Sequence, residues 1–158
     1  MGLQAFSSID LSQVSSISPI HQEENTSSTK ILYHITSLDS AMKILASGKM
    51  LRGKEGTLGA GIYFAENEEA CRVKARFEGV TIEAEVFVGI SLVPRKENEF
   101  AEVSQMTFKK LTNEFRCHSV KAEKLENDPY PEYCVYSSEQ IKIRRVWSAK
   151  GEILFEKM

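Results

Sequence analysis

Three residues in separate stretches of the chain carry side chains suited to chemistry. His34 lies in "LYHITS", Tyr63 follows the glycines of "GAGIYFA", and Glu132 opens "EYCVY". An imidazole can hold a hydroxyl group, an aromatic ring can stack on a flat ligand, and a carboxylate can stabilise developing positive charge. Taken singly, each also has a plain structural interpretation: a strand histidine with a local partner, a core tyrosine and a solvated glutamate.

Residues typical of helix starts, helix ends and turns separate the elements around His34 and Tyr63. Residues 31–36 predict a short strand, and 37–48 predict a helix with a Ser or Asp cap at its start and Gly48 as its stop. A glycine-containing loop then leads to a strand at 62–65, and Asn67 caps the next helix. Glycines let the backbone adopt positive φ or approach a neighbour closely, so the loop also fits a tight turn feeding a buried strand.

The second half of the chain is richer in strands. Residues 80–93 alternate apolar and polar side chains and predict one long strand. Residues 104–115 predict a helix, and 132–136 and 140–147 predict strands, with "EILFEK" as a further candidate. Because strands outnumber helices and do not alternate strictly with them, the fold class is α+β.

The ordered motifs resemble those of the poly(ADP-ribose) polymerase-like ADP-ribosyltransferases, also called the diphtheria-toxin-like or H-Y-E class. In that family a "YHGT"-type strand precedes a helix, a glycine-rich loop, "GxGIYFA", a helix, a long strand and "NEYxVYxxxQI". The similarity runs from about Ile31 to Val146, and the pairing of "GAGIYFA" with "PEYCVY…QI" makes it specific. It implies an ADP-ribosyltransferase-like fold of two packed, mostly antiparallel sheets, with an NAD-binding cleft and peripheral helices.

The resemblance implies a transferase that uses NAD⁺ as co-substrate. Glu132 would hold the nicotinamide ribose and polarise the acceptor, Tyr63 would stack on nicotinamide, and His34 would hold the adenosine ribose. These three are the expected catalytic residues, and no metal is expected. The expected donor-binding residues are His34, Ile35, Thr36, Gly61, Tyr63, Cys71 and Glu132. The leaving nicotinamide is already cationic, so orientation and a negative charge beside the ribose would suffice for catalysis.

Three positions depart from the family pattern. Ile35 stands where glycine is usual, and Cys71 and Lys74 stand where a hydroxyl and a second stacking ring are common. Tyr33 is a candidate for that second ring. The leading hypothesis is a protein mono-ADP-ribosyltransferase. The alternatives are an NAD⁺ glycohydrolase, with water as acceptor, and a catalytically inactive binding module that keeps the fold.

The residue at one position bears on which amino-acid side chain accepts the ADP-ribose. Arginine-modifying relatives carry a second carboxylate two residues before the catalytic glutamate, where this chain has Tyr130. A guanidinium needs such help to become nucleophilic, so a protein hydroxyl or carboxyl acceptor is favoured over Arg. Transfer of single units is expected rather than chain elongation.

Composition restricts partners and compartment. The 158-residue chain has a net charge of −2, which does not favour nucleic acid as a partner. Its apolar stretches are too short to span a bilayer. Three cysteines without metal-ligand spacing (Cys71, Cys117, Cys134) favour a reducing, cytoplasmic compartment. A monomer is expected.

Residues 1–30 differ in composition from the rest. They contain eight serines and are interpreted as a leader or N-terminal extension, with the catalytic domain at 31–158. The segment resembles the leaders of bacterial effectors injected into host cells, so a host cytosol is the alternative location and a host protein the alternative target. Phe6 stands where a myristoylation signal requires Ser or Thr.

Overall fold

The computed structural model describes residues 20–74, 79–123 and 131–158, without the side chains of 73 and 74. Residues 1–19, Tyr130 and the side chain of Lys74, on which interpretations above depend, lie outside this description. The strands are β1 (His21–Glu24), β2 (Thr29–Thr36), β3 (Ile62–Ala65), β4 (Val80–Phe87), β5 (Ile90–Val93), β6 (Ser119–Ala122), β7 (Glu132–Val135), β8 (Ile141–Trp147) and β9 (Ile153–Glu156). The helical segments are α2 (Leu38–Ser47), α3 (Glu68–Lys74), α4 (Glu97–Val103), α5 (Phe108–Lys110), the π-helical η1 (Leu111–Phe115) and the 3₁₀ turn η2 (Ser138–Gln140).

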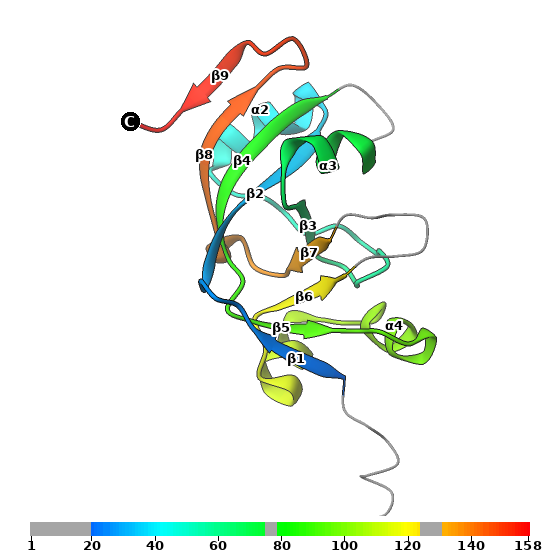
Figure 1. Ribbon diagram of the computed structural model, residues 1–158. Helices are drawn as coiled ribbons and strands as arrows, with labels where there is room; N and C mark the ends of the chain where they lie inside the picture. Colours follow the sequence, from blue (N-terminus) through cyan, green and yellow to red (C-terminus); the bar gives the residue numbers. More distant parts are fainter. Residues whose placement is uncertain (1–19, 75–78, 124–130) are drawn as a thin grey trace, which may run out of the picture.

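The described strands form one sheet in the order β1-β5-β6-β7-β3-β2-β4-β8-β9. Only the β5–β6 pair among them is parallel, which confirms the α+β class with a mostly antiparallel sheet. The expected pair of separate sheets is replaced by one strongly bent sheet. In Figure 1, β2, β4 and β8 run across the direction of β1, β5 and β6. The two halves meet at one described pair between β2 and β3, Tyr33 opposite Ala65.

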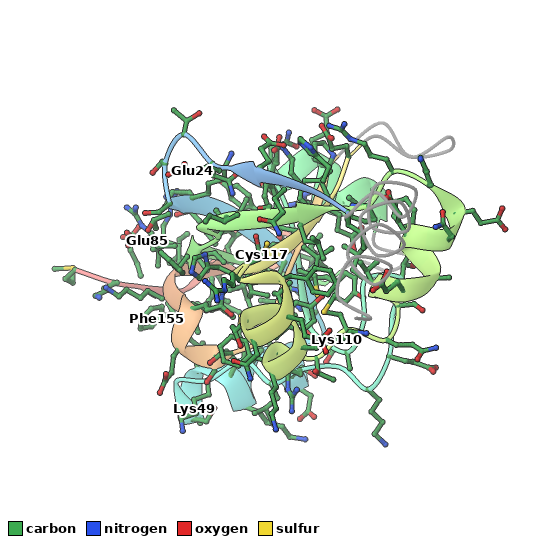
Figure 2. All side chains as sticks on the ribbon, turned by 90° about the horizontal axis from the view of Figure 1, so that it is seen from below. Glu24, Lys49, Glu85, Lys110, Cys117 and Phe155 are labelled. Atoms are coloured by element: carbon green, nitrogen blue, oxygen red, sulfur yellow. The ribbon has the colours of Figure 1, made fainter. Side chains whose placement is uncertain are left out.

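One apolar core joins the two halves of the sheet. Leu32 and Ile82, from β2 and β4, share a cluster of buried residues with Phe64 and Tyr133, from β3 and β7. A second cluster includes Leu92 of β5 and Leu111 of η1. Cys117 also belongs to the second cluster and lies where the chain leaves η1 for the sheet (Figure 2). Packing in the first cluster therefore fixes the angle at which β2 and β4 cross β3 and β7.

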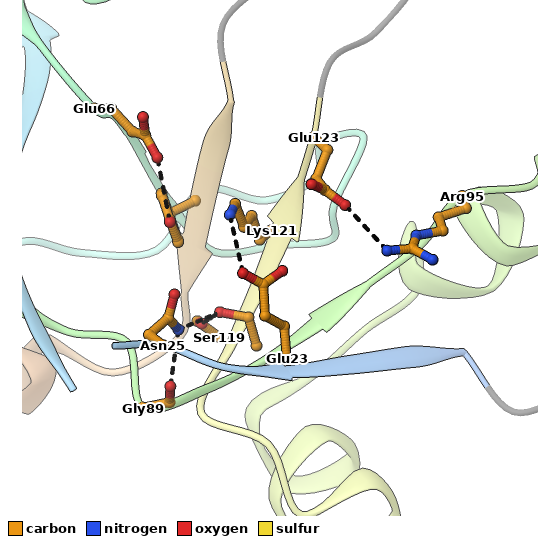
Figure 3. Close-up of polar contacts among 10 residues, drawn as sticks. Glu23, Asn25, Glu66, Gly89, Arg95, Ser119, Lys121 and Glu123 are labelled. Carbon is orange, nitrogen blue, oxygen red and sulfur yellow. Dashed lines mark hydrogen bonds and ion pairs between the residues drawn. The ribbon is translucent and has the colours of Figure 1, made fainter. Parts of the chain in front are cut away.

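The prediction of one long strand at 80–93 is wrong in one respect, because the chain bends at Gly89 and forms two strands, β4 and β5. Gly89 has φ +48, and a Cβ there would lie 2.3 Å from Nδ1 of His118. The Asn25 side chain donates to the Gly89 carbonyl at 2.8 Å and fixes the corner (Figure 3). The apolar alternation continues through the corner, since Val88 and Leu92 are both buried. A hydrophobic pattern therefore does not reveal this bend.

The expected helix at 104–115 begins later and is divided into α5 and η1, and it is preceded by a helix that was not predicted, α4. Helix α4 begins at Glu97, where buried Glu99 accepts hydrogen bonds from the backbone N–H groups of Arg95 and Lys96. Thr107 then caps α5 by accepting from the Lys110 N–H. Local capping, rather than the apolar spacing, sets these boundaries.

The helix starts around the candidate site agree with expectation. Ser37 accepts from the Ser40 N–H at the start of α2, which ends at Gly48 with φ +74. Asn67 accepts from the Ala70 N–H at the start of α3. In the described ranges, no helix combines the length and apolarity needed to cross a membrane.

Two strands have no counterpart in the sequence interpretation. β1 is the polar segment "HQEE", which pairs with β5 at one edge of the sheet, and β6 is the short segment "SVKA". The domain boundary drawn after residue 30 falls inside β2. The sheet thus includes residues of the stretch interpreted as a leader or extension.

Candidate functional site

Tyr63 and Glu132 lie on adjacent antiparallel strands. In the β3–β7 ladder, Ala65 stands opposite Glu132 and Tyr63 stands opposite Cys134. Directly paired residues project to the same face, as do residues two apart in one strand, so Tyr63 and Glu132 share a face. Burial, with smaller contributions from Cys134 and Glu132, raises the pKa of the Tyr63 phenol. The structure therefore brings two of the three expected catalytic residues together.

His34 projects from the other face of the sheet. Tyr33 is paired with Ala65 and therefore shares the face of Tyr63 and Glu132, so the next residue, His34, projects to the opposite face. The His34 ring contacts that of Phe64, with 5.8 Å between ring centroids. Its Nδ1 lies 2.6 Å from the backbone carbonyl oxygen of Tyr63. His34 is thus linked to Tyr63 through the backbone, and its side chain does not share the face of Glu132.

The hydrogen bond to Tyr63 selects the tautomer of His34. Burial lowers the pKa of His34, although the bond to the Tyr63 carbonyl acts in the opposite direction. The neutral ring carries one proton, and a carbonyl oxygen can only accept, so Nδ1 carries that proton. Nε2 is then left as a hydrogen-bond acceptor.

A cavity of about 420 Å³ lies between α2, the following loop and the strands. Among the expected donor-binding residues, it is lined by His34, Thr36, Gly61 and Tyr63. Glu132, Ile35 and Cys71 do not line it. Its volume falls within the range typical of small-molecule sites. The structure thus gathers four of the seven expected donor-binding residues around one cavity.

Ile35 and Cys71 meet elsewhere, in a small apolar cluster beneath α3. Buried Ala65, Ala70 and Cys71 pack there with partly buried Tyr33 and Ile35. The Ile35 side chain therefore packs against α3. Tyr33 meets Trp147 edge to face, with ring centroids 6.4 Å apart.

The glycines of "GAGIYFA" are explained by contacts within the protein. A Cβ at Gly61 would lie 2.3 Å from Sγ of Cys134 and 2.7 Å from the Val135 carbonyl oxygen. Gly59 has φ +96, which favours glycine. Contacts within the protein therefore account for both glycines, although Gly61 also lines the cavity.

Two tyrosine hydroxyls hold the loop before β3. The Tyr63 hydroxyl donates to the Gly59 carbonyl at 2.6 Å and accepts from the Leu58 N–H at 2.8 Å. The hydroxyl of Tyr136, just after β7, donates to the Leu58 carbonyl. A Cβ at Gly56 would lie 2.2 Å from the Tyr63 hydroxyl oxygen, so glycine is needed there as well.

The glutamine of "PEYCVY…QI" ties the segment after β7 to the bend between β4 and β5. The Gln140 amide nitrogen donates to the carbonyls of Phe87 (3.0 Å) and His118 (2.8 Å). Its oxygen accepts from the N–H groups of Tyr136 and Ser137, both at 3.2 Å. A position that the sequence offered only as part of a motif is thus a structural clamp.

The polar face of α2 forms a wall of the cavity that the sequence interpretation missed. Ser40, Lys43 and Ser47 line it, together with Lys49 and Glu55 of the following loop. The α2 residues recur at three- and four-residue intervals, so helical periodicity would have placed them on one face.

No model of a known protein family matches the chain. Curated proteins likewise give no match. In the part of the chain that the structure describes, no group of three or more His, Cys, Asp or Glu side chains is arranged to hold a metal ion.

Proposed function

We propose that the protein transfers single ADP-ribose units from NAD⁺ to a hydroxyl or carboxyl side chain of a protein. The observation that carries the proposal is the pairing of β3 with β7, which sets Tyr63 and Glu132 on one face of adjacent strands. This pairing agrees with the resemblance of the ordered motifs to the H-Y-E class of ADP-ribosyltransferases.

The chemistry asks little of the protein beyond position and charge. Nicotinamide leaves NAD⁺ as a neutral molecule because its ring is already cationic, so no general acid is needed. Positive charge then develops on the ribose, as in glycoside cleavage. The carboxylate of Glu132 would stabilise that charge and accept a hydrogen bond from the incoming hydroxyl. Tyr63, whose hydroxyl is held by Leu58 and Gly59, would offer its ring to nicotinamide.

The cavity suits the adenosine half of NAD⁺. Nε2 of His34 is an acceptor, as a ribose hydroxyl requires, and the Thr36 hydroxyl lines the same space. Lys43 and Lys49 also line the cavity, and their ammonium groups would pair with the pyrophosphate of NAD⁺. In this arrangement the cavity would hold the adenosine half, and nicotinamide would lie at Tyr63, which lines the cavity and shares a face with Glu132.

A nucleotide-binding module without transferase activity is the second candidate. The packing of Ile35 with Cys71 and Ala65 favours it, because the side chains at two expected donor-binding positions pack within the protein. Such a protein would keep the cavity beside His34 and bind the adenosine half alone.

Incubation of the full chain with NAD⁺, labelled in its adenylate phosphate, and a whole-cell lysate tests the proposal. Label on discrete protein bands is the expected result. Release of free ADP-ribose without labelled protein would identify an NAD⁺ glycohydrolase instead. If neither appears while NAD⁺ still binds, the protein is a binding module and the proposal is wrong.

A further inference from the structure

A second hollow, of about 470 Å³, adjoins the cavity because Met50 and Leu51 line both. Buried Met50 and Tyr136 contribute its apolar interior. Leu51 and Phe108 line it as well, although they are 83% and 39% exposed. We call this hollow the Leu51 groove. Exposed apolar side chains around a hollow are typical of a surface that contacts another molecule.

The charged residues that line the Leu51 groove are both basic. Among the residues that the structure describes, Arg52 and Lys109 line it and no carboxylate does. Within the described ranges, neither cation forms an ion pair. Nearby Lys49 and Lys110, which mark the two flanking segments in Figure 2, are also basic. A chain with a net charge of −2 thus has a locally cationic groove.

The groove also offers hydroxyl groups. Thr107, Ser137 and Ser138 line it beside the two cations. Thr107 and Ser137 use an oxygen lone pair to accept from the N–H groups of Lys110 and Glu139. Their hydroxyl protons therefore stay available for an acceptor such as a carboxylate.

We propose that the Leu51 groove binds an acidic segment of a partner protein that inserts one apolar side chain. Carboxylates would pair with Arg52 and Lys109, while the apolar side chain packs beside Leu51 and Phe108. Charge complementarity of this kind steers association, and a central apolar anchor supplies much of the affinity.

A peptide fits these residues better than a nucleic acid. Sequence-independent binding of single strands uses several aromatic rings on which successive bases stack. Of the described residues that line the groove, Phe108 is the one exposed aromatic, since Tyr136 is buried with its hydroxyl bonded to Leu58. The proposal does not depend on transferase activity.

Binding of a fluorescein-labelled peptide, in which one leucine is flanked by aspartates and glutamates, tests the proposal without NAD⁺. We expect saturable binding that weakens about tenfold in the double variant Arg52→Glu/Lys109→Glu. Leu51→Ser should weaken it as well without affecting folding, because the Leu51 side chain is largely exposed.

The double variant Arg144→Glu/Lys150→Glu is the matched control. It makes the same change in net charge at two exposed residues that do not line the groove. Equal weakening in this control would reveal non-specific attraction and overturn the proposal. It would also be overturned by absence of binding to the native protein, or by tighter binding of a single-stranded oligonucleotide that competes with the peptide.

Discussion

The imidazole of His34 is hydrogen-bonded through Nδ1 to the backbone carbonyl of Tyr63, 2.6 Å away, where strands β2 and β3 part. The ladder between these strands has one described residue pair, Tyr33 with Ala65, and the His34 ring supplies a donor just beyond it. A side chain thus satisfies a β3 carbonyl beside the end of the ladder. The same bond determines which nitrogen of His34 can accept from a ligand.

The stability of the protein should depend on pH through His34. Burial lowers its pKa below the ordinary value of 6.5, so the unfolded chain binds this proton more readily than the folded one. The contribution is fully present above 6.5 and is lost as pH falls from there towards the lowered pKa. We expect His34→Gln to remove up to about 1.4 kcal/mol per pH unit of this dependence. Urea unfolding at pH values on both sides of this window measures the free energy of unfolding of both proteins. If this free energy changes with pH equally in His34→Gln and the native protein, the prediction is contradicted.

Replacement of Glu132 should separate binding from transfer. Glu132→Gln keeps size and hydrogen-bonding capacity but removes the charge, so NAD⁺ binding should persist while transfer falls about 10²–10³-fold. Glu139→Gln is the control, because Glu139 is exposed on η2. Calorimetry and labelled-NAD⁺ transfer measure the two effects. The reverse pattern would show that the catalytic carboxylate is misassigned.

Two substitutions of Tyr63 distinguish its ring from its hydroxyl. Tyr63→Ala should weaken NAD⁺ binding by about 1–3 kcal/mol, the usual contribution of stacking on an aromatic ring. Tyr63→Phe keeps the ring and should leave affinity nearly unchanged. It should lower the free energy of unfolding by about 1–3 kcal/mol, because the Leu58 N–H and Gly59 carbonyl lose their partner. Equal loss of NAD⁺ affinity in both variants would argue against stacking.

The two glycines Gly61 and Gly53 should respond differently to alanine. Gly61→Ala forces a Cβ against Cys134 and the Val135 carbonyl, so the free energy of unfolding should fall by about 1–3 kcal/mol. A Cβ at Gly53 would have its nearest atoms at 3.6 and 3.8 Å, so alanine should be tolerated there. Adding Cys134→Ala to Gly61→Ala should recover part of the loss. Thermal unfolding measures all three variants, and equal effects at the two glycines would contradict the packing argument.

The sequence predicted best those features that depend on local chemistry. Helix α2 begins after Ser37 and ends at Gly48 because a cap and a left-handed glycine act within one turn. Strand β3 has the expected bounds. The bend at Gly89 was not predictable from alternation, because the residues that contact it, Asn25 and His118, are far from it in the sequence. β1 was missed because an edge strand of polar residues has no buried face to reveal it.

The candidate site was predictable only in part for a related reason. The order of motifs anticipated that Tyr63 and Glu132 belong together, and the β3–β7 ladder places them on one face. The side from which His34 projects depends on the register between β2 and β3, which no local pattern encodes. The cavity wall on α2 depends on how that helix docks, and tertiary packing decides this.

The loop clamped by Tyr63 and Tyr136 has a consequence for the energetics of ligand entry. Its backbone is further fixed by the Gly53 N–H bonded to the Gly61 carbonyl and the Gly59 N–H bonded to the Gly56 carbonyl. A wall that is already ordered loses little conformational entropy when a ligand arrives. Association with this cavity should therefore follow single-step kinetics, with a rate constant proportional to ligand concentration and no slower rearrangement after the encounter.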